Sequence, residues 1–159
     1  MIKSILIIPI FFIIFLAFSS CSKEKISSNL YEESIASDLV FYQNTDVILS
    51  PAGSSPHGPF KLKFNEKAKS QLGSDGKLPD GATFKNGSLI VKEIYSGSTL
   101  QLIAVMKKND SKYSGEGWLW AEYKPDGTAV YNISDKGKSC IACHSASINR
   151  DLTNSFDLH

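Results

Sequence analysis

The sequence predicts an α+β fold in which an antiparallel β-sheet of about four or five strands is flanked by helices. The first observation behind this prediction is a period of two in the second half of the chain. Four segments rich in β-branched and aromatic residues have this period: residues 88–95, 99–107, 117–123 and 128–133. The second observation is that turn residues, such as Gly97, separate these segments. Consecutive strands joined by short turns favour an antiparallel meander.

Helical periodicity is present on the N-terminal side of the predicted sheet. An amphipathic helix is expected over about 30–42, packed on the sheet, from the spacing of Tyr31, Ile35, Leu39 and Tyr42. A fifth, short strand is expected over 60–64. Asn65 is a favourable N-cap for a second short helix over 66–72. A third short helix is expected over 145–151.

The N-terminal segment differs in composition from the rest of the chain. Lys3 precedes an apolar run over residues 5–18, and small residues stand directly before Cys21. This pattern is typical of a secretory signal peptide. A cysteine after small residues is typical of a bacterial lipoprotein signal, which is cleaved before that cysteine and acylated on its thiol. A single uncleaved anchor helix would give the same topology.

These features predict a lipoprotein signal peptide over 1–20, a lipidated tether over 21–28 and a folded domain over 29–159. The domain would then face the periplasm at the bacterial cell envelope, attached to a membrane through its lipid. The signal peptide contains one basic residue and no acid, so its removal leaves equal numbers of basic and acidic residues. A neutral domain gives no electrostatic reason to expect nucleic acid as a partner.

Cys140, Cys143 and His144 form a Cys-x-x-Cys-His motif. This spacing is the attachment signature of a c-type haem, in which both sulfurs bond the porphyrin and the histidine binds iron through a neutral nitrogen. A redox dithiol does not need the trailing histidine, and a zinc site needs two further ligands, for which only His57 and His159 remain. The motif therefore predicts one covalently bound haem c, attached through Cys140 and Cys143 in a C-terminal haem-binding turn after the last strand, with His144 as the metal ligand.

The ligand at the sixth coordination position of the iron determines whether a haem protein transfers electrons or catalyses a reaction. Met106 is the only methionine after the predicted cleavage, and it shares a strand face with Leu102 and Ala104. This position favours a core residue over an iron ligand. His57 is favoured as a loop residue and His159 is terminal, so an open, five-coordinate iron is expected.

Lys92 interrupts an apolar strand face between Ile90 and Ile94. Two interpretations stay open from the pattern alone. The side chain either extends to solvent at an edge of the sheet, which the pattern favours, or points into a site that uses an amine.

An ordered set of short segments is specific when taken together: residues 57–59, 64–68, 79–81, 89–93, 105–108, 117–120 with 125–127, and 140–144 with Asp151 and Phe156. With this set the chain resembles the cytochrome P-460 family, which includes the cytochromes c′-beta. The resemblance extends over about residues 55–156. It implies an antiparallel sheet with flanking helices, usually a homodimer, and a five-coordinate haem.

The resemblance also implies functions for individual residues. In the hydroxylamine-oxidising members, the lysine that matches Lys92 is joined to a meso carbon of the porphyrin, which makes Lys92 the candidate catalytic residue. Members of the c′-beta type lack this cross-link and bind nitric oxide or carbon monoxide in an apolar pocket. The oxidising members use a carboxylate as proton acceptor. The sequence does not place that group, because Ser145 follows the motif and no acid occurs before Asp151.

Two functional hypotheses follow. The first is a haem oxidoreductase that oxidises hydroxylamine or acts on a small nitrogen oxide or a peroxide, with Lys92 altering the electronic properties of the haem. The second is a non-enzymatic haem protein that binds a diatomic gas or passes electrons to a partner at the membrane. A zinc-stabilised module is a third, less favoured hypothesis.

Overall fold

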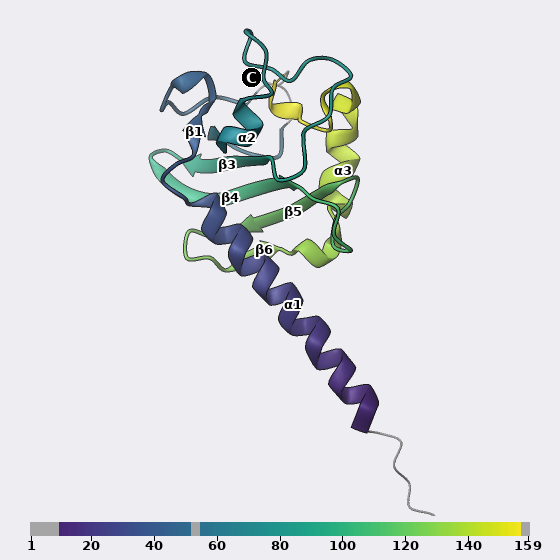
Figure 1. Cartoon of the computed structure of the whole chain (residues 1–159). Helices are drawn as coiled ribbons and strands as arrows, with labels where there is room; N and C mark the ends of the chain where they lie inside the picture. The colour runs from purple at the N-terminus through teal and green to yellow at the C-terminus, as the bar shows by residue number, and fades with distance from the viewer. Residues whose placement is uncertain (1–9, 52–54, 157–159) are drawn as a thin grey trace, which may run out of the picture.

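The computed structural model of the chain describes residues 10–51 and 55–156 (Figure 1). Its centre is an antiparallel sheet with the strand order β1-β2-β3-β4-β5-β6, so each strand pairs with its neighbours in the chain. The strands are β1 (Val40–Phe41), β2 (Phe60–Phe64), β3 (Leu89–Ser96), β4 (Thr99–Lys108), β5 (Trp118–Tyr123) and β6 (Ala129–Tyr131). The α+β class and the antiparallel meander are therefore confirmed, with six strands in the described residues.

In the residues that the structure describes, three α-helices and four 3-10 helices accompany the sheet. The α-helices are α1 (Ile10–Ser34), α2 (Glu66–Lys69) and α3 (Lys138–His144). The 3-10 helices are η1 (Tyr42–Asn44), η2 (Ile133–Asp135), η3 (Ser145–Arg150) and η4 (Asn154–Phe156). The short helix predicted after Asn65 is confirmed but ends at Lys69 instead of residue 72, and Asn65 caps it, because Asn65 Oδ1 accepts a hydrogen bond from Ala68 N at 2.9 Å. The segment predicted as a C-terminal haem-binding turn is instead the helix α3.

The helix predicted over 30–42 is wrong in its extent. Helix α1 ends at Ser34, and the following residues turn into β1, where Val40 pairs with Phe64. Tyr42 then enters the core on the other side of the sheet. A long-range strand pairing thus overrides the local helical spacing.

The two faces of the sheet bury different side chains. Helix α1 covers one face, where Leu30 packs among apolar residues such as Val91 and Val105. Glu33 of this helix forms an ion pair with Lys107 Nζ at 2.6 Å. From this contact α1 projects away from the domain (Figure 1). The opposite face carries most of the aromatic core, including the stacked rings of Phe64 and Phe156.

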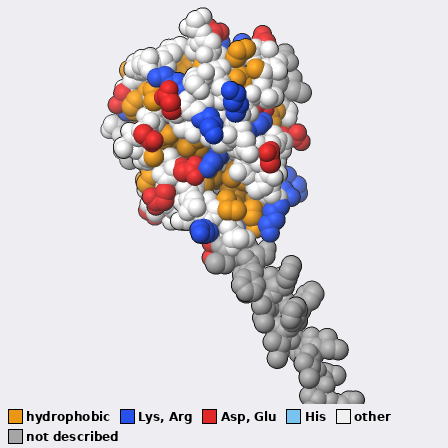
Figure 2. Space-filling view, in the orientation of Figure 1, with side chains coloured by type: hydrophobic (Ala, Val, Ile, Leu, Met, Phe, Trp, Pro, Cys, Tyr) orange, Lys and Arg blue, Asp and Glu red, His pale blue; other side chains and the backbone are white. Residues whose placement is uncertain are grey.

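The surface seen in the same orientation carries acidic and basic side chains side by side (Figure 2). In the part of the chain that the structure describes, no helix is sufficiently long and apolar to cross a membrane. The first half of α1 overlaps the predicted signal peptide, and Cys21 lies within this helix. Residues 22–28, predicted as a tether, are also helical, and Tyr123 Oη donates to Ser27 O at 2.9 Å. Cleavage and acylation stay predictions.

Candidate functional site

A cavity of about 360 Å³ lies between the face of the sheet opposite α1 and the helix α3. This volume is within the range of small-molecule and cofactor pockets, roughly 300–1,000 Å³. Its walls are mainly apolar and include Leu62, Ile90, Leu102, Ala104, Met106 and Trp120. Met106 is buried, as the sequence predicts for a core residue, and it also contributes to the cavity wall.

The strand register brings three cavity residues into one row across the sheet. Lys92 of β3 pairs with Ala104 of β4, which pairs in turn with Glu122 of β5. Residues paired in this way point to the same face of a sheet, and neighbouring strands are about 4.8 Å apart. Lys92 and Glu122 therefore begin about 10 Å apart, with the small side chain of Ala104 between them.

Helix α3 brings the motif residues to the other wall of the cavity. Cys140, Cys143 and His144 all line it. Their spacing of three and four residues places them on one helix face, which is why a single cavity can receive all three. Cys140 is partly buried, which raises the pKa of its thiol to about 11.

The position of α3 depends on Gly137, which precedes its first residue. Gly137 has a φ of 68°, and a Cβ on this residue would lie 2.3 Å from Cδ1 of Trp120. Glycine therefore permits both the left-handed backbone and the close approach of the helix to the indole. Trp120 in turn contacts the His144 ring edge-on, with the ring centroids 4.9 Å apart.

His144 is oriented so that one ring nitrogen stays free. Its Nδ1 lies 2.6 Å from the carbonyl oxygen of Leu152. A carbonyl can only accept, so Nδ1 carries the proton and donates it. Burial is the largest influence on the His144 pKa and lowers it, so the ring is neutral at pH 7. A neutral imidazole protonated at Nδ1 offers the Nε2 lone pair to a metal.

Lys92 does not lie at an edge of the sheet, because β2 and β4 flank β3. The interpretation that its side chain reaches solvent at an edge is therefore wrong. The side chain lines the cavity, and its Nζ stands 3.9 Å from the centroid of the Phe60 ring. Burial lowers the pKa of Lys92 to about 8, so a substantial fraction of the amine is neutral near physiological pH.

Glu122 and His57 are further titratable residues of the cavity wall, and they lie close to each other. Glu122 Oε1 and His57 Nδ1 lie 4.0 Å apart. Burial raises the pKa of Glu122, whereas burial, followed by the charges of Lys92 and His144, lowers the pKa of His57 to about 4. The period of two places Glu122 on the same strand face as Trp120, but the pattern does not show which face borders a cavity. His57 was expected to be a loop residue, and its loop turns it inward.

An iron–porphyrin fits this arrangement. Two thiols and a neutral imidazole face one apolar cavity, and the imidazole presents an unprotonated nitrogen to it. The fold and the site thus define a haem-binding protein of the α+β class. The family model described as Cytochrome P460 matches residues 42–155, and the chain belongs to this family. Comparison with curated proteins gives no match.

Membership of the cytochrome P460 family makes this chain a haem protein of a family that acts on nitrogen compounds. The resemblance identified from the sequence is thereby confirmed. The cavity and the family are both compatible with a small-molecule ligand.

Proposed function

We propose that this chain is an exported, lipid-anchored cytochrome with one haem c and an open iron position at which hydroxylamine or a small nitrogen oxide is oxidised. One observation carries the proposal: Cys140, Cys143 and His144 meet Lys92 at a single cavity. In this proposal the two sulfurs hold the porphyrin and His144 Nε2 binds the iron. The haem supplies a site that binds the substrate and accepts its electrons.

Glu122 is proposed as the proton acceptor. Oxidation of hydroxylamine releases protons together with electrons, so a base beside the substrate accelerates it. The Glu122 carboxylate is partly buried in the cavity wall, and His57 Nδ1 lies 4.0 Å from Oε1, beyond direct hydrogen-bond distance. The electrons leave to an external one-electron acceptor, such as a second redox protein at the membrane.

Lys92 is proposed as the residue that modifies the haem. Its amine is partly neutral and is held in the cavity by β3, so it is a competent nucleophile towards the porphyrin edge. A bond from its nitrogen to a meso carbon would replace one N–H and one C–H bond. The reaction therefore needs a two-electron oxidant, such as a peroxide.

The absorption spectrum of the reduced protein tests this proposal. The full chain is produced in a host that attaches c-type haem, and Lys92→Ala is compared with Lys63→Ala. Lys63 is the matched control, because it lies on the neighbouring strand and pairs with Glu93. We expect a strongly red-shifted band that is lost in Lys92→Ala and kept in Lys63→Ala. An ordinary c-type spectrum in the unaltered protein would contradict a cross-linked haem.

The apolar walls of the cavity favour a second candidate function, the binding of a diatomic gas without turnover. Carbon monoxide and nitric oxide need no proton acceptor and bind well in apolar pockets. A spectrum that shifts with carbon monoxide, together with no hydroxylamine-dependent reduction of an electron acceptor, would support this function. A six-coordinate spectrum that is indifferent to carbon monoxide would instead indicate an electron carrier.

The lipid anchor and the homodimer are separate parts of the proposal. Cys21→Ser should abolish incorporation of labelled fatty acid and release the protein from membranes, if Cys21 is the acylated residue. Sedimentation of the detergent-solubilised protein should give the mass of a dimer. A monomer that is still acylated would contradict the homodimer alone.

A further inference from the structure

We propose that Asp151 is a positioning residue for the iron ligand, because it fixes a left-handed turn whose carbonyl at Leu152 holds His144 Nδ1. The inference rests on the proposed function of His144 as a haem ligand. Asp151 is not among the residues that line the cavity, so it acts through His144 and does not contact the substrate.

The carboxylate of Asp151 is buried and joins three separate parts of the fold. Its side chain retains only 8% exposure. Oδ1 accepts from Lys108 Nζ at 2.7 Å and from Trp118 Nε1 at 3.4 Å. Oδ2 accepts from the backbone N–H of Phe84 at 2.8 Å. The turn is thereby attached to β4, to β5 and to the loop before β3.

The backbone at this turn is strained. Asp151 has a φ of 51° and Leu152 a φ of 65°, and neither is glycine. A left-handed backbone is unfavourable for residues other than glycine and persists only where the surroundings hold it. Two consecutive residues of this kind need a strong restraint, and the buried carboxylate supplies it.

The strained turn has a direct consequence for His144. It aims the carbonyl of Leu152 at Nδ1, at a distance of 2.6 Å. Asn154, two residues later, donates from Nδ2 to the carbonyl of Cys143 at 3.2 Å. A hydrogen bond from Nδ1–H to a carbonyl orients a ligating histidine and makes it a stronger electron donor. Loosening the turn should therefore weaken the iron–histidine bond and favour the reduced iron.

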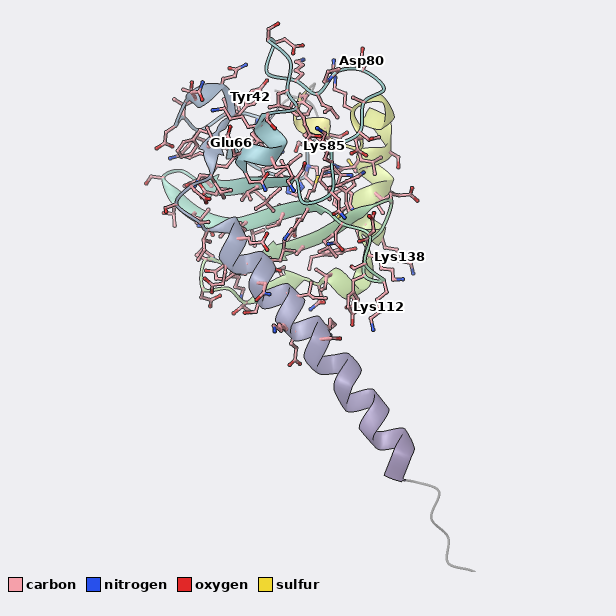
Figure 3. All side chains as sticks on the ribbon, in the orientation of Figure 1. Tyr42, Glu66, Asp80, Lys85, Lys112 and Lys138 are labelled. Carbon is pink, nitrogen blue, oxygen red and sulfur yellow. The ribbon has the colours of Figure 1, made fainter. Side chains whose placement is uncertain are left out.

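The test compares two Asp→Asn variants of the haem-loaded full chain. Asp151→Asn keeps the shape of the side chain and removes its charge. Asp80→Asn is the matched control, because Asp80 lies on an outer loop (Figure 3) and is 75% exposed, yet its partner is Arg150, directly before the turn. The measurements are the iron–histidine stretching frequency of the reduced protein, by resonance Raman spectroscopy, and the reduction potential.

We expect Asp151→Asn to lower the stretching frequency and raise the potential, and Asp80→Asn to change neither. If Asp151→Asn lowers only the thermal stability, the residue supports the fold and the inference is overturned. Trp118→Phe removes the weakest of the three bonds to the carboxylate. Trp118→Phe should also lower the stretching frequency and raise the potential, each by a smaller amount. This variant still tests the inference if Asp151→Asn does not fold.

The measurements distinguish the function of His144 as iron ligand from its positioning by Asp151. An unaltered protein without any iron–histidine band would contradict the proposed function of His144. An unaltered protein that has the band, with the same frequency in Asp151→Asn and Trp118→Phe, would contradict only the positioning by Asp151.

Discussion

Replacement of Gly137 by alanine should destabilise the site much more than replacement of a glycine in open space. Gly137 has a φ of 68°, and an added Cβ would meet Cδ1, Nε1 and Cγ of Trp120 at 2.3, 2.5 and 2.6 Å. The indole cannot retreat freely, because its Nε1 donates to Gly115 O at 3.0 Å and its ring contacts His144. Gly81 is the control, since its φ is 76° and a Cβ there meets nothing within 4 Å.

The expected costs can be worked out from these contacts. An alanine with a left-handed backbone lowers the free energy of unfolding by about 1–2 kcal/mol. At Gly81 there is no further cost, because the added Cβ meets no neighbour. At Gly137 the overpacking adds about 1–3 kcal/mol. Loss of the Trp120 hydrogen bond adds about 1 kcal/mol. The difference between the variants is thus about 3 kcal/mol, or about 6–12 °C in the melting temperature of a chain of this size.

Thermal unfolding of the haem-loaded protein, followed by circular dichroism, measures this difference. The haem spectrum should also change in Gly137→Ala, because the displaced indole shifts the His144 ring. Equal melting temperatures for Gly137→Ala and Gly81→Ala, with identical haem spectra, would refute the reasoning about the contact between α3 and Trp120.

Three further predictions concern the proton acceptor, the docking of α1 and the core. Glu122→Gln should lower the rate of hydroxylamine oxidation at least about a hundredfold, measured by reduction of an electron acceptor, with haem content unchanged. Burial raises the Glu122 pKa, so as the pH is lowered the rate should begin to fall at a higher pH than an ordinary carboxyl group would cause. The same dependence of the rate on pH in Glu122→Gln and the unaltered protein would contradict this. Tyr123→Phe should lower the free energy of unfolding, measured by chemical denaturation, by about 1 kcal/mol, because it removes the hydrogen bond to Ser27 O. An unchanged free energy would mean that this hydrogen bond does not stabilise the packing of α1 on the sheet. Phe156→Ala should cost about 3–5 kcal/mol, since its ring is 1% exposed and stacks on Phe64, and a cost below about 1 kcal/mol would contradict that packing.

The sheet could be predicted from the sequence because strands that are neighbours in the sheet are also consecutive in the chain. The segments of β3, β4 and β5 are also rich in β-branched and aromatic residues. The end of α1 could not be predicted in this way. Val40 lies within the predicted helix but belongs to a strand, because it pairs with Phe64. These two residues are distant in the sequence, so the local spacing of apolar residues does not predict their contact.

From the residue pattern alone, the candidate site could be predicted only where its residues form a contiguous motif, and Lys92 was assigned to it only through the family resemblance. Cys140 to His144 carry their own signature, whereas Lys92 and Glu122 depend on which strand face borders the cavity. The alternation of a strand gives two faces without saying what covers either of them. The turn at Asp151 gives no signal at all, because its left-handed residues include no glycine.

The intact mass of the purified protein tests directly whether one haem is covalently attached through Cys140 and Cys143. The chain is produced with the c-type haem attachment machinery and is unfolded before measurement, so that only covalent groups remain. We expect the added mass of one haem, which is lost when Cys140 and Cys143 are both replaced by serine. A protein with the mass of the bare polypeptide, or one whose haem is retained without the two cysteines, would contradict this attachment.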